Sequence, residues 1–267
     1  MSDLPQLREA RLELDARGVA TLTLARDDVR NALTGTALIP DIVAACDWIN
    51  RNTAVGALVL TGDGKAFSSG GNITDMREKR GMFGGSPIEV QDGYRRGIQQ
   101  LTLAMHRLEV PAIAAVNGPA IGAGLDLCCM CDIRIGSEYA KVGSTFVNLG
   151  IIPGDGGASF QPRLVGVQRA AELMFSGRIV EPAESQAIGL FLEVVPAGAL
   201  LERAQALAAQ FAGKPRSALR MTKRLIQTGQ RLELPDFLDY CASLQSLCHT
   251  SEEHMAALEA FMARQGG

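Results

Sequence analysis

One stretch near the middle of the chain, residues 117–132 (NGPAIGAGLDLCCMCD), constrains the fold more than any other. It follows the apolar run 111–116, which predicts a buried strand because it is too short for a helix and ends at turn residues. Small residues at 118–124 allow a tight turn and a close approach by another molecule. An apolar pattern typical of a buried helix then continues to Cys131. The start of such a helix leaves backbone N–H groups without intrahelical acceptors, so it stabilises negative charge.

A second glycine-rich turn, residues 68–73 (SSGGNI), comes earlier in the chain, after the apolar run 57–60 and the segment 61–67. One such turn is a weak signal, because an ordinary strand-to-helix connection has the same composition. Two of them, each at the end of a predicted buried strand, can direct two N–H groups at one oxygen atom.

Three segments carry a resemblance to a known family. VNGPAIGAGLDL, KAFSSGGNI and LGIIPGDGG resemble, in sequence and spacing, the signature segments of the crotonase superfamily, the enoyl-CoA hydratase/isomerase family. The resemblance extends over essentially the whole chain. It implies an α/β fold, a crotonase-like spiral of ββα units with a helical C-terminal trimerisation domain, and an enzyme that acts on acyl-CoA thioesters.

The order of patterns along the chain predicts an α/β core followed by a helical tail. The elements expected in the core include a hairpin at 10–24, a helix at 39–52, a strand at 57–60, a mobile loop at 77–92, a helix at 94–108 and a last strand at 192–195. After Pro196 only helical patterns occur, at about 199–212, 215–228, 235–247 and 251–264. We therefore place an α/β core with the acyl-CoA site at residues 1–196 and a helical oligomerisation region at 197–267.

The resemblance assigns the two glycine-rich turns to an oxyanion hole. The positions that match the family's backbone donors are Gly71 and Ala123. In the family, these N–H groups bind the thioester carbonyl, whose oxygen becomes an enolate oxyanion when a proton is added or removed beside it. Donors that are already in place stabilise that charge without reorganising.

Proton transfer also needs side chains, and here the chain departs from the family pattern. Hydratases of the family use two glutamates; the first position is Asp126 in this chain, and the second is Phe146, which cannot transfer a proton and lies in the substrate pocket. Asp155, in the third signature segment, is the candidate that compensates, because a carboxyl group facing an apolar pocket has a raised pKa suited to acid–base work. The alternative for Asp155 is a helix N-cap.

The resemblance also maps contacts with coenzyme A, which is part of the substrate; no permanently bound cofactor is expected. The mapped positions are Lys65, Ala66, Ser68, Gly70, Asn72 and Ile73, together with Phe261 and Arg264, which match positions that reach a neighbouring subunit's CoA. A basic stripe on one predicted helix, formed by Arg216, Arg220, Lys223 and Arg224, is more typical of a solvated face than of a phosphate site.

Composition and charge argue against several other classes of protein. A net charge of −3 gives no broad field to attract nucleic acid or an anionic membrane. The charged start, residues 1–15, has no secretory h-region, and no apolar run approaches the roughly 20 residues of a membrane span, so we expect a cytoplasmic protein. Cys128 and Cys131 have CxxC spacing but no matching second pair, so core cysteines are expected and no metal site.

The leading hypothesis is an acyl-CoA enzyme that catalyses hydration/dehydration or double-bond isomerisation through an enolate. The missing second glutamate favours an isomerase or a specialised hydratase. Alternatives are a hydrolase or dehalogenase that uses Asp155, a CoA-binding homologue without turnover, and an RNA-binding relative; the last is disfavoured because the helix at 39–52 carries Asp41 and Asp47. We predict a homotrimer or a dimer of trimers, held by apolar tail residues that include Leu232, Leu234, Phe237, Leu238 and Leu244.

Overall fold

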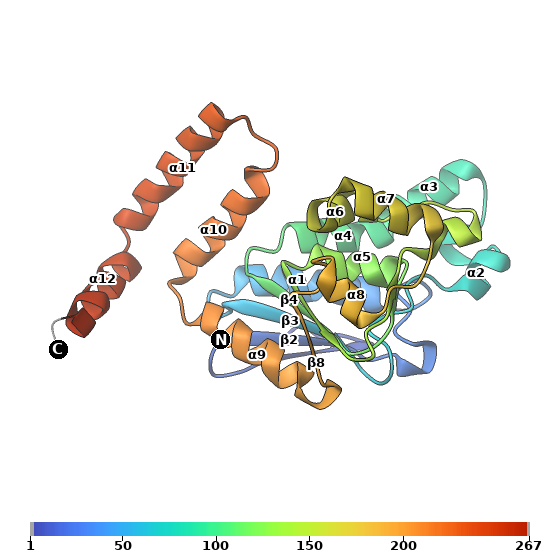
Figure 1. Cartoon of the computed structure of the whole chain (residues 1–267), viewed down its shortest axis with the longest axis horizontal. Coiled ribbons are helices and arrows are strands. Elements are labelled where there is room, and N and C mark those ends of the chain that lie inside the picture. The colour runs from blue at the N-terminus through green and yellow to red at the C-terminus, as the bar shows by residue number, and fades with distance from the viewer. Residues whose placement is uncertain (1–2, 266–267) are drawn as a thin grey trace.

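The structure, a computed structural model, describes residues 3–265 and is built on a six-stranded sheet (Figure 1). The strands lie in the order β1 (Ala10–Leu14), β2 (Val19–Leu24), β3 (Ala57–Gly62), β4 (Ala112–Val116), β6 (Ile133–Ser137) and β8 (Glu193–Val195). β1 and β2 form the predicted antiparallel hairpin, and the strands from β2 onward pair in parallel. The predicted α/β class is confirmed.

Helices cover both faces of this sheet. On one face lies α9 (Leu200–Ala212), whose Ala204 and Ala208 pack against Val59 and Ile113. The other face is covered by α1 (Leu38–Arg51), α4 (Ile98–His106) and α5 (Ala123–Met130). Because β3 and β4 are buried on both faces, their sequences are continuous apolar runs and do not alternate.

The glycine-rich segment 77–92, predicted to be a loop, is partly helical. A 3-10 turn at Gly81–Phe83 is followed by α3 (Pro87–Arg96), which ends at Gly97 directly before α4. The side chain of Glu89 accepts hydrogen bonds from the N–H and O–H groups of Ser86, both at 2.7 Å. This capping box, with a proline at the first helical position, stabilises a helix start despite the nearby glycines.

The remaining elements lie around this core. They are β5 (Ala120–Ile121), β7 (Val142–Gly143), α2 (Ile73–Arg77), α6 (Gly157–Val165), α7 (Val167–Ser176), α8 (Pro182–Ala187) and 3-10 turns at Asp27–Val29, Thr145–Leu149 and Ala197–Ala199. Cys128 is buried, and burial raises the pKa of its thiol to about 12, so it behaves as a core residue.

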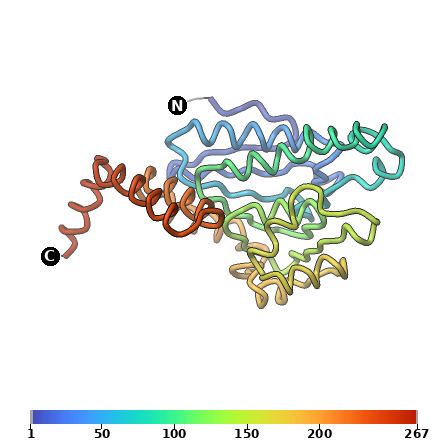
Figure 2. Tube along the Cα trace, turned by 90° about the horizontal axis from the view of Figure 1, so that it is seen from above, coloured from blue at the N-terminus to red at the C-terminus, as the bar shows by residue number. Residues whose placement is uncertain are grey.

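Three tail helices, α10 (Arg216–Thr228), α11 (Leu234–His249) and α12 (Glu252–Gln265), extend away from the sheet (Figures 1 and 2). α10 is attached by its basic stripe. Arg220 pairs with Glu109 at 2.7 Å and donates to the backbone carbonyl of Asn50 near the end of α1, where a cation is favourable. Lys223 donates to Asp132 at 2.7 Å. The expectation of a solvated face is therefore wrong for Arg220 and Lys223, whereas the side chain of Arg224 is 53% exposed.

Large apolar side chains remain exposed on the tail. Leu234, Leu238 and Phe261 have 66%, 56% and 57% of their surface exposed, whereas Leu244 is buried within the chain itself. Across residues 3–265, no helix has the length and hydropathy that a bilayer crossing requires.

Candidate active site

Backbone pairing holds the two glycine-rich turns side by side. The carbonyl of Ser68 accepts from the N–H of Ile121 at 3.0 Å, and the carbonyl of Pro119 accepts from the N–H of Phe67 at 3.1 Å. Two residues after Ser68, Gly70 has a φ of +79°, and a Cβ atom there would lie 2.5 Å from the carbonyl oxygen of Ile121. Only glycine fits this position, which brings the first turn against the start of α5.

The amides of Gly71 and Ala123 are the two predicted oxyanion donors, and both residues line one small cavity. Ala123 is the first residue of α5, so its N–H has no intrahelical acceptor. Within residues 3–265, the amide of Gly71 also donates to no backbone or side-chain acceptor. The cavity has about 30 Å³ of room for the centres of water-sized molecules, against roughly 10–15 Å³ needed for one water.

Asp155 and Phe146 line the same cavity, so the structure brings four of the predicted site residues together. The rest of its wall is mainly apolar and comprises Thr34, Met76, Met82, Phe83, Tyr94, Ile98, Ile151 and Gly154. The third signature segment is held there by α4, since Gln99 donates to the carbonyl of Gly154 at 2.9 Å and Thr102 donates to that of Asp155 at 2.7 Å. The cavity wall therefore includes two free amide donors and one carboxyl-bearing residue, Asp155, whose carboxyl oxygens are themselves buried.

Asp126 lies near Asp155, in the first turn of α5. Its side chain is fully buried, that of Asp155 is 3% exposed, and the two carboxyl groups are near enough for each to affect the pKa of the other. Gln161 of α6 donates from Nε2 to Asp126 Oδ1 at 2.7 Å. A Cβ atom at Gly157 would lie 2.1 Å from that same oxygen, so the backbone of the third segment passes directly over the Asp126 carboxyl group.

Burial raises the pKa of both carboxyl groups. The pKa of Asp126 lies well above its ordinary value of 3.8 because burial and then the charge of Asp155 both disfavour its ionised form. The pKa of Asp155 is also raised by burial, which its contact with Asp126 and the nearby Gly157 amide only partly offset. The pair thus retains a proton at a pH where exposed aspartates are ionised.

Asp155 is not a helix N-cap. α6 begins at Gly157, its cap residue is Gly156 with a φ of 108°, and no side chain caps it. The alternative considered from the sequence is therefore wrong, and the buried Asp155 carboxyl accepts no hydrogen bond of good geometry from any N–H group or hydroxyl of residues 3–265.

The predicted CoA-binding strip has two kinds of residue. Lys65 and Ile73 expose their side chains. Ser68 is fully buried and donates to the carbonyl of Asn31 at 2.7 Å, and Asn72 caps α2 by accepting from the N–H of Thr74 at 3.0 Å. Buried Ala66 and Gly70, like Ser68, have only backbone atoms to offer a ligand.

Phe261 and Arg264 are not brought to the cavity in a single chain. Both are exposed on α12. Figures 1 and 2 place that helix at the opposite end of the molecule from α2 and α3. A contact with CoA from these residues requires a second copy of the chain.

Two residues of the site were missed by reasoning from the sequence. Gln161 is 1% exposed and follows Gly157 by one helical turn. The sequence feature that could have revealed it is a polar residue on the buried face of α6. Tyr94 lines the cavity, and burial followed by the charge of Asp155 raises its pKa. The feature that could have revealed it is an aromatic residue at the start of the helix predicted at 94–108, directly after the predicted loop.

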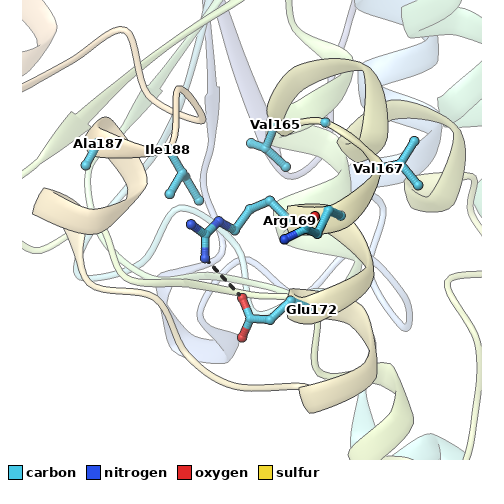
Figure 3. A pocket seen from close by; sticks show the side chains of 8 residues that line it. Val165, Val167, Arg169, Glu172, Ala187 and Ile188 are labelled. Atoms are coloured by element: carbon cyan, nitrogen blue, oxygen red, sulfur yellow. Dashed lines mark ion pairs between the residues drawn. The ribbon is translucent and has the colours of Figure 1, made fainter.

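A larger pocket of about 510 Å³ lies beside α7 and α8 (Figure 3). Arg169 and Glu172 face each other there at 3.7 Å, among apolar side chains such as Val165 and Ile188. None of the predicted site residues lines it. Across residues 3–265, no three His, Cys, Asp or Glu side chains are grouped as a metal site requires.

Comparison with known proteins agrees with this arrangement. A sequence profile described as enoyl-CoA hydratase/isomerase matches residues 15–266. The chain is 32% identical over 248 residues to a crotonyl-CoA hydratase of Syntrophomonas wolfei, covering 92% of each chain, and 30% identical over 265 residues to a 2,3-dehydroadipyl-CoA hydratase of Escherichia coli, covering 99% of this chain and 97% of the relative.

Solved structures show the same fold. A crystal structure of an enoyl-CoA hydratase from Bacillus anthracis superposes with a TM-score of 0.89 at 30% identity, covering 96% of this chain and 97% of that one. A putative enoyl-CoA hydratase from Streptomyces coelicolor gives a TM-score of 0.89 at 32% identity, covering 99% and 94%. By its sequence, its sheet and its paired glycine-rich turns, the chain belongs to the enoyl-CoA hydratase/isomerase family of the crotonase superfamily.

Proposed function

We propose that this enzyme acts on an acyl-CoA thioester, binds the thioester oxygen between the amides of Gly71 and Ala123, and moves a proton with Asp155. The observation that carries the proposal is that these three groups line one cavity. An enolate formed beside the thioester places its negative charge where the two amides point. A carboxyl group with a raised pKa then exchanges a proton with the neighbouring carbon.

Double-bond isomerisation requires only one carboxyl group. The Asp155 carboxylate takes a proton from the α-carbon of a 3-enoyl thioester, which breaks one C–H bond and leaves an enolate. The same carboxyl group then returns the proton to the γ-carbon, which forms one C–H bond and yields the 2-enoyl thioester. Phe146 occupies the position of the second glutamate, so no further carboxyl group of the cavity wall is available to activate water.

Hydration is the second candidate, because curated relatives at about 30% identity are named as hydratases. In this reaction Asp155 accepts a proton from the attacking water and delivers a proton to the α-carbon. Hydrolysis or dehalogenation with Asp155 as nucleophile is a third reading, and it requires a covalent acyl or alkyl ester on Asp155.

Two incubations in deuterated water decide between these reactions. With a 3-enoyl-CoA, isomerisation predicts growth of the conjugated enoyl-thioester absorbance. With crotonyl-CoA, hydration predicts loss of that absorbance together with deuterium at the α-carbon. Binding of both thioesters with no change in either signal would contradict the proposal, and an ester on Asp155 seen by mass spectrometry would favour the nucleophilic reading.

The assembly we propose is a homotrimer or a dimer of trimers, in which α12 brings Phe261 and Arg264 to the CoA of a neighbouring subunit. The exposed apolar side chains of α11 and α12 support it, because such surfaces mark protein contacts. Light scattering at micromolar concentration tests the assembly, and a monomer would contradict it. A cytoplasmic location and the lack of a permanently bound cofactor stay predictions.

A further inference from the structure

The turn that supplies the Gly71 amide is held by two residues of an earlier loop. The backbone N–H of Leu33 donates to the carbonyl of Gly70 at 2.7 Å. The backbone N–H of Asn72 donates to Oγ1 of Thr34, also at 2.7 Å. The peptide group before Gly71 and the peptide group after it therefore each have a partner on residues 33 and 34.

These two contacts set the direction of the Gly71 N–H group. In a planar trans peptide group the C=O and N–H bonds point in opposite directions. The Leu33 contact therefore turns the Gly71 N–H away from Leu33, and within residues 3–265 that N–H has no acceptor. Glycine restricts its own backbone angles less than any other residue, so its orientation depends on the contacts of the neighbouring peptide groups.

Thr34 makes the one contact of the two that uses a side chain. Its side chain is 4% exposed and lines the cavity together with Gly71. Its Oγ1 atom would lie 3.8 Å from a Cβ atom placed on Gly71. Packing alone does not require this hydroxyl group, because valine has the same shape. The role specific to the oxygen atom is to accept the hydrogen bond from Asn72.

The loop that carries Thr34 is itself anchored in the core. Asn31 is fully buried, and its Nδ2 group donates to the carbonyl of Ala66 at 2.9 Å. Its own carbonyl accepts from the hydroxyl group of Ser68 at 2.7 Å. Thr34 therefore extends from a segment that is already bonded to the residues just before the turn.

We infer that Thr34 is a positioning residue of the oxyanion hole: its hydroxyl oxygen holds the Asn72 N–H group and thereby fixes the Gly71 amide in the direction of the bound thioester oxygen. This inference rests on the proposed function, since it explains how one of the two oxyanion donors is held. Thr34 acts through the Gly71 amide and takes no part in proton transfer. A donor that is fixed beforehand stabilises the transition state more than the bound substrate, so the effect belongs in kcat.

The first test compares Thr34→Val, which removes the acceptor, with Thr34→Ser, which keeps it. Loss of a whole oxyanion donor costs about 100- to 1,000-fold, so a donor that is present but no longer fixed should cost less, about 10- to 30-fold in kcat. KM should change by less than about threefold, because the bound substrate depends less on this contact than the transition state does. Thr34→Ser should keep kcat within about threefold of the wild type.

Thr61→Val is the matched control. It removes another buried threonine hydroxyl, which donates to the carbonyl of Ala115 at 2.8 Å and does not line the cavity. It should leave kcat unchanged. Wild-type kcat in Thr34→Val, or equal losses in Thr34→Val and Thr34→Ser, would overturn the inference.

The second test reads the hydrogen bonds to the thioester directly and needs no turnover. Butyryl-CoA with ¹³C at the thioester carbonyl has no double bond to isomerise or hydrate, and hydrogen bonds lower its C=O stretching frequency. Bound to the wild type, Thr34→Ser or Thr61→Val, it should absorb at a lower frequency than free butyryl-CoA. Bound to Thr34→Val, it should absorb closer to the free value, which a loss of stability alone would not cause.

The outcomes of this measurement separate the two proposals. No lowering in the wild type would mean that the amides do not bind the thioester oxygen, so the proposed function and the inference would fail together. An equal lowering in the wild type and Thr34→Val would overturn the inference alone.

The third test uses only the wild type, so it still decides if Thr34→Val does not fold. In protein labelled with ¹⁵N, NMR should show that the Asn72 amide is protected from exchange with deuterated water before any ligand is added. The Gly71 amide should gain protection only when butyryl-CoA binds. If the Asn72 amide exchanges as fast as that of Gly71 in the free protein, Thr34 does not hold the turn and the inference is wrong.

Discussion

The cavity at the glycine-rich turns and the groove between α10 and the core differ in volume and in how their polar groups are paired. The cavity has about 30 Å³ of room, whereas the groove has about 490 Å³ and is lined by apolar side chains such as Phe160, Leu164 and Ile226. Yet in the groove the buried cation Lys223 is paired within the chain, with Asp132 and with the carbonyl of Val110. Around the cavity, by contrast, the amide of Gly71 and the carboxyl group of Asp155 have no hydrogen-bond partner of good geometry within residues 3–265.

In the proposed mechanism, the reactive site is the small cavity, whose polar groups are free for a ligand, and not the much larger groove. Leaving buried polar atoms without partners costs stability, so a fold keeps them only where surrounding contacts fix them. Here Thr102 and Gln161 hold the Asp155 segment and Asp126 in place. Changes at the cavity should therefore affect turnover, and changes at the groove should affect stability.

The largest effect is expected at the carboxyl group that lines the cavity. Asp155→Asn removes the group that moves the proton, so kcat should fall about 100- to 10,000-fold while the protein stays folded. Steady-state kinetics with the preferred enoyl-CoA and circular dichroism check both parts. Asp63→Asn changes an exposed aspartate paired with Arg11 and is the control; a loss below tenfold for Asp155→Asn would remove Asp155 from the mechanism.

The second expectation concerns one amide donor. Ala123→Pro deletes the N–H group at the first position of α5, where proline is compatible with a helix. We expect a loss of about 100- to 1,000-fold in kcat/KM. Val167→Pro makes the same change at the first residue of α7, which also follows a glycine, and should leave activity unchanged. Similar kinetics for the two variants would show that the Ala123 amide binds no oxyanion.

Lys223→Met tests the expectation that a change at the groove affects stability and not turnover. It leaves the carbonyl of Val110 without the ammonium donor and removes the ion pair of Asp132, so the free energy of unfolding should fall by about 1–3 kcal/mol. The value of kcat should change by less than about twofold, since the groove contains no reacting group. Urea unfolding and kinetics measure the two quantities, with exposed Lys214→Met as control. A selective loss of kcat would mean that the groove takes part in the reaction.

The smallest effect is a change in how stability depends on pH. The pKa of Asp126 is raised in the folded protein, and the unfolded chain titrates near 3.8, so between these values the folded state binds more protons. The free energy of unfolding should therefore fall as pH rises through that window. Asp126→Asn should flatten this fall, as measured by urea unfolding at several pH values, and Asp63→Asn should not. Parallel curves for the wild type and Asp126→Asn would contradict the raised pKa.

Much of the fold was predictable because local patterns encode it. The hairpin, the buried strands β3 and β4, and the four helices after Pro196 follow from alternation, apolar runs and helical spacing. The two glycine-rich turns were recognised, and the structure places Gly71, Ala123, Asp155 and Phe146 around one cavity. The start of α3 was missed although its signal, Ser86 followed three residues later by Glu89, is present in the sequence.

Other features depend on contacts between distant parts of the chain. The basic stripe of α10 looked solvated because its partners, Glu109 and Asp132, lie about a hundred residues away in the sequence. The contact between Gln161 and Asp126 was not predictable either. It arises from the packing of α6 against α5, which brings the Gln161 amide to one oxygen of Asp126.

The close approach of Gly157 to Asp126 has a consequence for redesigning the active site. A Cβ atom at 157 would lie 2.2 Å from the carboxyl carbon of Asp126. A side chain at 157 and the carboxyl group at 126 would therefore occupy the same space. A glutamate at 126, the side chain that hydratases of the family carry there, would need extra space that this loop does not leave. Anyone who converts this protein toward two-glutamate chemistry must therefore move the backbone at 155–157 first, and a library that varies 126 and 146 alone would sample mostly side chains that cannot fit.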